Sequence, residues 1–285
     1  MDDPRLELLL SLADDELILG HRLSEWTGWV PYLEADLALS SIAQDELGHA
    51  RALYSLAVDM GAAPDVDAIA LGRQPEGYRN AALNELPNTD YAFTLARQWL
   101  YDHADRVRCA ALESSSWSEL AGLLRTIRLE EDYHLAHADT WVRRLADGPI
   151  DARHRLARAI ADAIPFASAV LAPLPHESEL LADGILTVGS EGLIDQWLGS
   201  IGEMLDEIGL DRMLASAEMV PTSAGAIEGS TVEPGLPGLT LVDGRWKHDG
   251  SFDVPDGRAG DHTEHLRPLW EELTGLYRAH PGVSW

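Results

Sequence analysis

The amino-acid sequence predicts an all-α fold built on a four-helix bundle, and three observations indicate it. Apolar residues recur at alternating steps of three and four through four long segments, as on the buried face of a helix. Stretches rich in glycine and proline divide these segments into two helical hairpins. The motif Glu-x-x-His occurs in the second helix of each hairpin, at Glu46–His49 and at Glu131–His134. The chain therefore repeats one helical arrangement twice.

The first hairpin is predicted to join a helix from about Pro4 to Trp26 to a longer helix from Tyr32 to Met60. A Gly-Trp-Val-Pro break at residues 28–31 separates them, and Gly61 ends the second helix. The buried stripe of that second helix consists of Leu39, Ile42, Glu46, His49, Leu53, Leu56 and Met60. Charged groups in the middle of an apolar face are costly unless a partner compensates them.

The second hairpin is predicted at about Thr89 to Leu112 and Ser116 to Ala146, and Gly148-Pro149 ends it. Prolines and glycines between residues 62 and 87 predict a connection, with at most a short helix, that crosses one end of the bundle. In the last helix of this hairpin the buried stripe consists of Leu120, Leu124, Ile127, Glu131, His134, Ala138, Trp141 and Leu145. Both motifs therefore fall in the middle of apolar stripes.

Residues 149–285 are expected to add further helices, so that residues 1–285 form a single ferritin-like domain around a four-helix metal-binding core at residues 1–148. The helical pieces predicted in the added region lie at residues 152–171, with a kink at Pro165, and at residues 192–205 and 210–219. We expect them to cover the core.

The last part of the chain is predicted to hold a loop-rich excursion and a final helix. Four prolines and eight glycines fall within residues 220–261, where residues 239–242 are expected to form a brief strand. The final helix spans about residues 264–278. Its docking face is predicted to consist of Leu266, Leu269, Trp270, Leu273 and Tyr277.

A single acidic residue precedes each motif at nearly the same distance. Glu16 lies thirty positions before Glu46, and Asp102 lies twenty-nine positions before Glu131. One carboxylate from each of two helices, with Glu-x-x-His from each of two others, is the ligand set of di-iron and di-manganese centres in ferritin-like bundles. The predicted metal ligands are therefore Glu16, Glu46, His49, Asp102, Glu131 and His134.

This ligand set also predicts which metals bind. Four carboxylates balance two divalent ions when both histidines are neutral, and a mixed nitrogen and oxygen set favours iron or manganese over ions that prefer thiolates. We expect two iron ions, with two manganese ions or a mixed pair as alternatives. No catalytic group beyond the ligands is predicted, and no glycine-rich phosphate motif indicates an NTPase or a flavin protein.

Neighbouring groups leave several alternatives open. Asp14 and Asp15 adjoin the acidic residue of the first helix, and His103 and Asp105 compete with that of the third. Glu130 is expected to be an exposed neighbour, although it would replace Glu131 if the helical register slipped.

Three further polar positions have no settled role in the sequence. Asp45 is expected either to orient a ligand histidine or to lie on a solvated face, and His137 has the same status. The pair His262 and His265 lies near a helix start without a third ligand, so we interpret it as a cap and packing feature rather than a zinc site.

Composition excludes several classes of partner. The formal net charge of −27, from 48 acidic and 21 basic residues, opposes binding to nucleic acid or to an anionic membrane. No apolar run approaches the roughly 20 residues that span a bilayer. Cys109 is the one cysteine, so no internal disulfide forms, and the first residues lack the pattern of a secretion signal. We therefore expect a cytoplasmic protein.

Several segments resemble a known family over nearly the whole chain. The segments that carry the resemblance are Leu12–Trp26, Glu34–Leu39, Gly48–Arg51, His262–Leu266, Pro281-Gly282 and Trp285. They are similar to the C-subunit family of the bacterial phenylacetyl-CoA 1,2-epoxidases, which are multicomponent monooxygenases of phenylacetate catabolism. In that family the di-iron site belongs to the related A subunit, which epoxidises the aromatic ring of a CoA thioester, and the C subunit is its structural partner.

The resemblance implies partners and also a difference. An A-type catalytic subunit and a reductase with flavin and iron-sulfur groups are expected partners, in a homo- or hetero-oligomer that acts on an aryl-CoA. The familiar C subunits replace most metal ligands, whereas this chain keeps them and so resembles the ligand pattern of the A subunit. We hypothesise that both subunit types descend from a metal-binding ancestor.

Three functions stay open at this point. The chain is a C-type subunit that still binds metal, a stand-alone di-iron oxygenase, or a ferritin-like oxidase, peroxidase or manganese catalase. The long region after Gly148 exceeds what a minimal ferritin bundle needs, which favours an oxygenase assembly.

Overall fold

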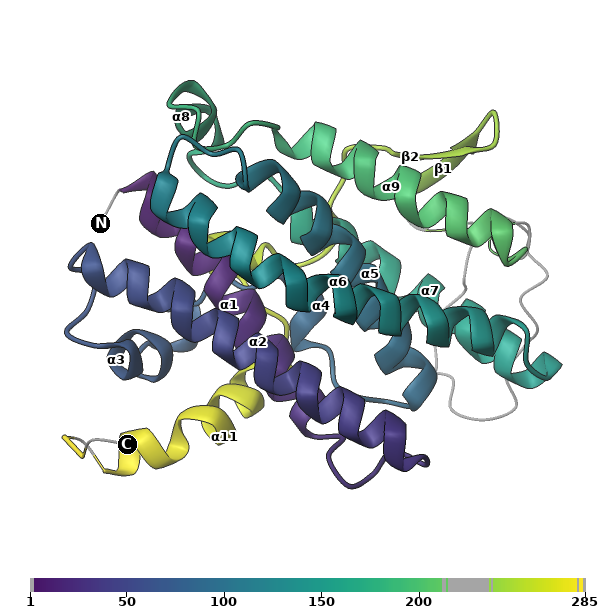
Figure 1. Ribbon diagram of the computed structural model, residues 1–285, viewed down its shortest axis with the longest axis horizontal. Coiled ribbons are helices and arrows are strands. Elements are labelled where there is room, and N and C mark those ends of the chain that lie inside the picture. The colour runs from purple at the N-terminus through teal and green to yellow at the C-terminus, as the bar shows by residue number, and fades with distance from the viewer. Residues whose placement is uncertain (1–2, 212–213, 215–235, 237, 281, 284–285) are drawn as a thin grey trace.

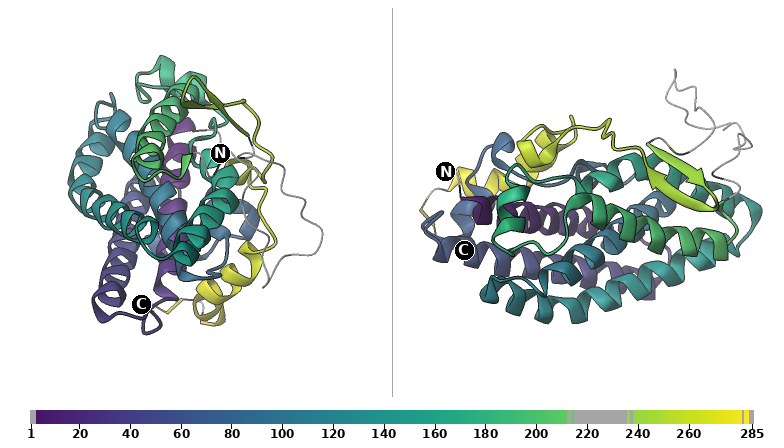
Figure 2. Two further views of the ribbon diagram at one scale, coloured as in Figure 1. Left: turned by 90° about the vertical axis from the view of Figure 1, so that its right-hand side faces the viewer. Right: turned by 90° about the horizontal axis from the view of Figure 1, so that it is seen from above.

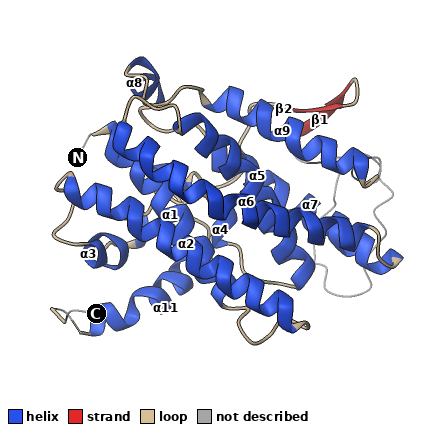
Figure 3. Ribbon diagram, in the orientation of Figure 1, coloured by secondary structure: helices blue, strands red, loops and turns tan. Residues whose placement is uncertain are grey.

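The computed structural model describes residues 3–211, 214, 236, 238–280 and 282–283. It confirms the all-α fold, because helices make up nearly all of its regular structure (Figures 1 and 3). The two predicted hairpins are present. Their helices are α1 (Pro4–Ser24), α2 (Leu33–Asp59), α5 (Tyr91–Leu112) and α6 (Ser118–Ala146).

Local signals set the ends of these helices. The side chain of Asp3 accepts a hydrogen bond from the backbone N–H of Arg5 and caps α1, whose first residue is Pro4. Asp90 caps α5 in the same way through the N–H of Phe93. Gly61 follows the end of α2 and has a φ of 82°, the left-handed conformation that glycine adopts without strain and that terminates helices.

The bundle buries two apolar clusters with a polar layer between them. One cluster includes Leu23, Ile42 and Trp99, and the other includes Leu9 and Leu53. Each of the four long helices contributes to both clusters, and the two Glu-x-x-His motifs lie where α2 and α6 pass from one cluster to the other, with Glu16 near the same level of α1. The polar layer therefore crosses the whole bundle and is covered by apolar side chains on both sides.

Close packing of α1 against α2 sets the spacing within this layer. A Cβ atom added at Gly20 would lie 3.0 Å from Cβ of Glu46 and 3.1 Å from the carbonyl oxygen of Ala43. A side chain at position 20 would therefore push the two helices apart beside a predicted ligand.

Three elements of the added region pack on α5. They are α7 (Ile150–Ala167), the 3₁₀-helix η2 (Ser168–Leu171) and α9 (Ser190–Glu207), and the three views show α7 and α9 lying along the bundle (Figures 1 and 2). Trp197 of α9 is fully buried, and its indole N–H donates to the carbonyl of Leu100 at 3.2 Å. Pro165 lies inside α7, which ends two residues later and continues as η2.

The connection between the hairpins is more structured than predicted. It contains α3 (Val66–Leu71), the 3₁₀-helix η1 (Pro75–Gly77) and α4 (Ala82–Glu85), so the prediction of at most one short helix was wrong. Asp65 caps α3 by accepting from the N–H of Ala68 at 2.8 Å. Tertiary burial stabilises α4, all four residues of which are buried against the bundle.

Two further differences concern the end of the chain. The brief strand is confirmed as β1 (Leu239–Val242), and it pairs with an unpredicted antiparallel strand β2 (Arg245–His248) across Asp243-Gly244. Both turn residues have positive φ, as an Asp-Gly hairpin turn requires. The short helix α8 (Glu177–Ala182) was not predicted. Most of the helical piece expected at residues 210–219 lies outside the described residues.

The C-terminal segment closes over α1 and the connection. It contains the 3₁₀-helix η3 (Gly257–Ala259) and α11 (Leu266–Ala279). Leu266, Leu269 and Trp270 are buried, as the predicted docking face requires. A Cβ at Gly257 would overlap the carbonyl oxygen of Asn80, so only glycine permits this close approach. None of the described helices combines the length and apolar character needed to cross a membrane.

Candidate metal centre

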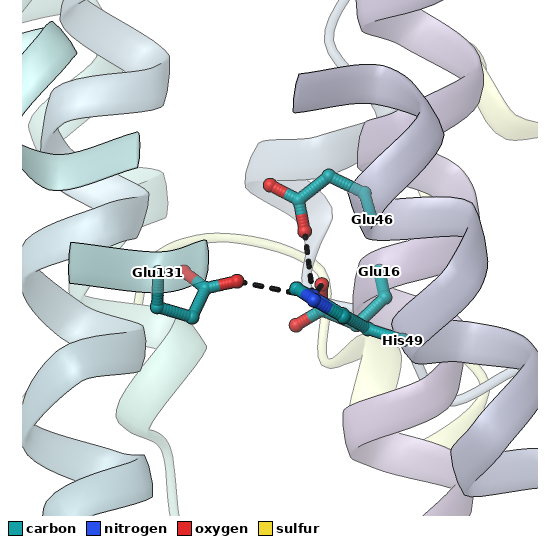
Figure 4. Close-up of side chains that lie close together, drawn as sticks. All are labelled: Glu16, Glu46, His49 and Glu131. Carbon is teal, nitrogen blue, oxygen red and sulfur yellow. Dashed lines mark ion pairs between the residues drawn. The ribbon is translucent and has the colours of Figure 1, made fainter. Parts of the chain in front are cut away.

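Four predicted ligands from three helices meet inside the bundle. Glu16 comes from α1, Glu46 and His49 from α2, and Glu131 from α6 (Figure 4). One ligand atom from each lies within 4.8 Å of all the others. All four side chains are buried, with exposed fractions of 4% or less. The helical stripes thus bring together residues more than a hundred positions apart.

The two histidines face the carboxylates through the same ring atom. Nδ1 of His49 lies 3.1 Å from Oε1 of Glu131, 3.6 Å from Oε2 of Glu16 and 3.9 Å from Oε2 of Glu46. Nδ1 of His134 lies 3.5 Å from Oε1 of Glu46 and 3.4 Å from Oε1 of Glu131. Glu46 and Glu131 therefore each contact both histidines.

Asp102 lies at the margin of this cluster. It is buried on α5, and the side-chain amide of Gln98 donates to its Oδ1, while its Oδ2 accepts no hydrogen bond from the described residues. Burial, and next the charge of Glu131, raise its pKa well above the usual range. The structure brings four of the six predicted ligands together, places His134 in contact with Glu46 and Glu131, and leaves Asp102 within electrostatic reach of Glu131 and His134.

The polar atoms at the centre of the layer lie within ion-pair distance of one another but form no hydrogen bonds with the described residues. In the described part of the chain the orphaned atoms are Oε2 of Glu16, both carboxylate oxygens of Glu46 and Glu131, Oδ2 of Asp102, and Nδ1 of His49 and His134. Buried polar groups in folded proteins are almost always paired, and a buried group left without a partner is costly. These oxygen and imidazole nitrogen donors fit iron or manganese, so the residues present suit the metals predicted from the sequence.

Burial and charge interactions shift the pKa values of these groups. Burial, and then repulsion from Glu16 and Glu131, raise the pKa of Glu46 well above its usual range. Burial opposes charging of His49, but its interactions with the carboxylates of Glu131 and Glu16 outweigh burial and raise the pKa of His49 to about 12. The pKa of His134 is raised for the same reason, by Glu131 and Glu46. Burial opposes ionisation of Glu131 as well, yet the two histidines lower its pKa to about 2.

The outer nitrogen of each imidazole, Nε2, contacts one carboxylate. Nε2 of His49 lies 2.7 Å from Oε2 of Glu130, and Nε2 of His134 lies 3.3 Å from Oδ2 of Asp45. Each carboxylate belongs to the residue before the glutamate of the opposite motif, so the two motifs exchange contacts reciprocally. Such contacts fix the imidazole ring and turn its other nitrogen towards the centre. Asp45 has the orienting geometry that was one of its two expected roles.

Glu130 has a contact that the sequence analysis missed. Its side chain is 55% exposed, as expected of a neighbour, and the helical register places Glu131 rather than Glu130 inside. The signal that could have revealed its role is the acidic residue that directly precedes the glutamate in both motifs.

The acidic competitors on α1 are engaged elsewhere. Asp14 accepts hydrogen bonds from Arg73 and from the hydroxyl of Tyr54. Asp15 accepts from Arg108 at 2.6 Å and from Arg258 at 2.7 Å. Both side chains are fully buried and fully paired, which leaves Glu16 as the carboxylate of α1 that faces the centre.

The remaining competitors also have structural partners. His103 contacts Ser200 at 2.6 Å, and Asp105 pairs with Arg108. His262 contacts Glu85 at 2.7 Å, as expected of a packing feature.

The fold and this site together define a class of protein. Four long helices that present two Glu-x-x-His motifs to a buried carboxylate layer make a ferritin-like bundle, and the buried cluster is compatible with a dinuclear metal site. Residues 1–214 match the family model described as "Phenylacetic acid catabolic protein", and the chain belongs to this family. It is 29% identical over 276 residues to the C subunit of the 1,2-phenylacetyl-CoA epoxidase of Escherichia coli (strain K12), covering 97% of each chain. The resemblance noted in the sequence is thereby confirmed.

Proposed function

We propose that this chain is a subunit of a phenylacetyl-CoA epoxidase-like monooxygenase of phenylacetate catabolism and that it holds its own dinuclear metal centre. Near-complete coverage of a C subunit supports the first part. One observation carries the second: a layer of buried nitrogen and oxygen donors whose inward atoms have no hydrogen-bond partner among the described residues. A purely structural subunit would gain nothing from such a layer.

The residues that would hold the two ions are Glu16, Glu46, His49, Asp102, Glu131 and His134. We infer that the ions are iron, with manganese or a mixed pair as alternatives; bound iron would supply binding and activation of dioxygen. Asp45 and Glu130 would hold the outer protons of the histidines, so that both Nδ1 atoms face the ions. The apolar clusters on both sides would keep water out of the layer.

The proposed complex includes an A-type catalytic subunit and a reductase, in the cytoplasm, with an aryl-CoA as substrate of the assembly. Exposed apolar side chains support a protein partner. Trp29, Leu33 and Leu37 at the start of the first hairpin have exposed fractions of 79%, 69% and 61%. On α6, Leu129 is 67% exposed and Tyr133 is 51% exposed. Large exposed apolar groups of this kind mark interaction surfaces when they cluster. Residues 1–285 would act as one domain in this assembly.

Metal analysis tests the proposal. Protein expressed with iron and manganese available is assayed by inductively coupled plasma mass spectrometry, and about two ions per chain are expected. The Glu46→Ala/Glu131→Ala variant should lose them. The control variant Glu34→Ala/Glu119→Ala removes exposed glutamates from the same two helices and should keep them. Folded wild-type protein without iron or manganese would refute the metal centre and leave a structural subunit.

A second measurement separates the subunit from a stand-alone enzyme. The metal-loaded chain is mixed with reductase and aryl-CoA, with and without an A-type subunit. Turnover that requires the A-type subunit supports the proposal. Turnover by the chain and reductase alone would assign a self-sufficient oxygenase, and peroxide consumption without a reductase would assign a peroxidase or catalase.

A further inference from the structure

A cavity of about 230 Å³ lies beside the candidate metal centre, lined by residues of α5 and α6 and of the turn after α5. The residues that line it are Arg106, Cys109, Ala110, Glu113, Arg128 and Glu131. Nothing in the ligand arrangement requires an open space on this side of the layer. The apolar clusters close the layer along the bundle axis, so this cavity is a lateral opening towards it.

The lining residues show that the cavity runs from the surface to a ligand. Glu131 is 4% exposed, and its Oε2 accepts no hydrogen bond from any described residue. At the other end the side chains of Arg106 and Arg128 are 48% and 45% exposed, and Ala110 is exposed. A buried ligand and a solvated rim therefore share one cavity.

Two ion pairs cross the rim of the cavity, Arg106–Asp132 at 2.9 Å and Arg128–Glu113 at 3.2 Å. A third, Arg128–Asp132 at 3.2 Å, lies along α6. Pairs that are this exposed are weak, so they can separate while α5 and α6 stay folded. Ion-paired side chains, including those of Arg106 and Arg128, therefore cover the solvent end of the cavity.

We propose that this cavity is the passage by which small ligands, of the size of dioxygen or azide, reach the Glu131 side of the metal centre. The function of this passage depends on the proposed metal centre, but the cavity itself is present in the metal-free chain. The volume is below that of pockets that hold drug-sized molecules, so a CoA thioester does not fit in it.

Cys109 offers a direct readout of access. It is the one cysteine of the sequence, it lines the cavity, and it is 5% exposed. Its thiol donates a hydrogen bond to Asp105 at 3.1 Å, and burial raises the pKa of the thiol well above its usual range. The thiol therefore reacts slowly, at a rate that reports how often a small reagent reaches it.

The experiment measures labelling of Cys109 in the full-length, metal-free protein by intact mass spectrometry. Methyl methanethiosulfonate is the small reagent, and a polyethylene glycol maleimide is the bulky one. Ala110→Trp fills the rim and should slow small-reagent labelling about tenfold, whereas Arg106→Ala/Arg128→Ala should speed it several-fold. Ala136→Trp, at an exposed alanine of α6 away from the cavity, is the matched control and should leave the rate unchanged. The bulky reagent should label only unfolded protein.

Two results would overturn the passage. One is a labelling rate in Ala110→Trp equal to that of wild type, and the other is labelling by both reagents only in step with global unfolding. On iron-loaded protein, the azide-induced absorption change should also form more slowly in Ala110→Trp. Thiol labelling needs no metal, so failure of the proposed metal centre and failure of the passage are distinguishable. A protein that binds no metal can still show slower labelling in Ala110→Trp, which would support the passage alone. A protein that binds metal can still show equal labelling rates, which would refute the passage alone.

Discussion

Replacing Arg258 with methionine removes a guanidinium that ties the C-terminal segment to the interior of the bundle. The Arg258 side chain is 3% exposed. It donates to the carbonyls of Ser11 at 3.0 Å, Arg79 at 2.6 Å and Val170 at 2.8 Å, and to both carboxylate oxygens of Asp15. Methionine fills a similar volume without donating, so the variant isolates the loss of these contacts.

The contacts left behind set the size of the effect. Breaking a buried ion pair by removing one partner typically costs about 3–5 kcal/mol. Asp15 keeps two donors in the variant, Arg108 at 2.6 Å and the N–H of Ala81 at 2.7 Å, so it is not left uncompensated. We therefore expect the lower end of that range, a loss of about 3 kcal/mol in the free energy of unfolding.

Urea unfolding followed by far-ultraviolet circular dichroism measures this loss, and the midpoint should fall by about 1 M or more. The matched control is Arg267→Met, which breaks an exposed pair with Glu76 whose side chains are 59% and 65% exposed. It should cost less than about 1 kcal/mol. If Arg258→Met costs no more than the control, the buried pair does not hold the C-terminal segment in place.

Three further predictions concern the polar layer. Binding of two divalent ions should release protons, because the pKa values of Glu46, Asp102 and the two ligand histidines are all raised, which favours their protonated forms in the metal-free protein. Calorimetry in buffers of different ionisation enthalpy counts them. Glu130→Gln and Asp45→Asn should each lower metal affinity about 10–100-fold in competition with a chelator, as loss of an outer partner typically does. Burial lowers the pKa of His137 to about 4 from 6.5, so the unfolded chain binds a proton there first as the pH falls. The free energy of unfolding should therefore be unaffected by His137 above about pH 6.5 and should fall as the pH drops from there towards 4. The His137→Phe variant should show a weaker dependence of the free energy of unfolding on pH in this range.

Distinct outcomes would contradict each of these. Release of no protons would mean that the ligands are already ionised in the metal-free protein. Unchanged affinity in the two outer variants would mean that the histidines hold their orientation without them. An unaltered pH dependence in His137→Phe would assign the acid sensitivity to other groups.

The sequence was sufficient for the long helices and for most of the candidate site, because both depend on local periodicity. Glu46 and His49 fall on one stripe of α2, and Glu131 and His134 on one stripe of α6, so the register alone turns them inward. The spacing of the preceding acidic residue indicated Glu16, and the arrangement of α1 agrees with it.

Other features depend on contacts that no local pattern encodes. The bond between Arg258 and Asp15 spans 243 positions, and the burial of α4 depends on elements far from it in sequence. Short helices such as α8 have too few residues to establish a period. The contact of Glu130 with His49 joins two motifs whose relative height in the bundle is set by packing, for example at Gly20.

Three consecutive acidic residues of α1 serve three different parts of the molecule. Asp14 binds the connection between the hairpins, Asp15 binds α5 and the C-terminal segment, and Glu16 faces the centre. During divergence these positions are under separate constraints, since the first two maintain the fold whatever becomes of the metal. If the proposed metal centre is present, a lineage that abandoned metal binding would be expected to substitute position 16 more readily than the two aspartates, so the residues of this helical turn would distinguish relatives that bind metal from those that do not.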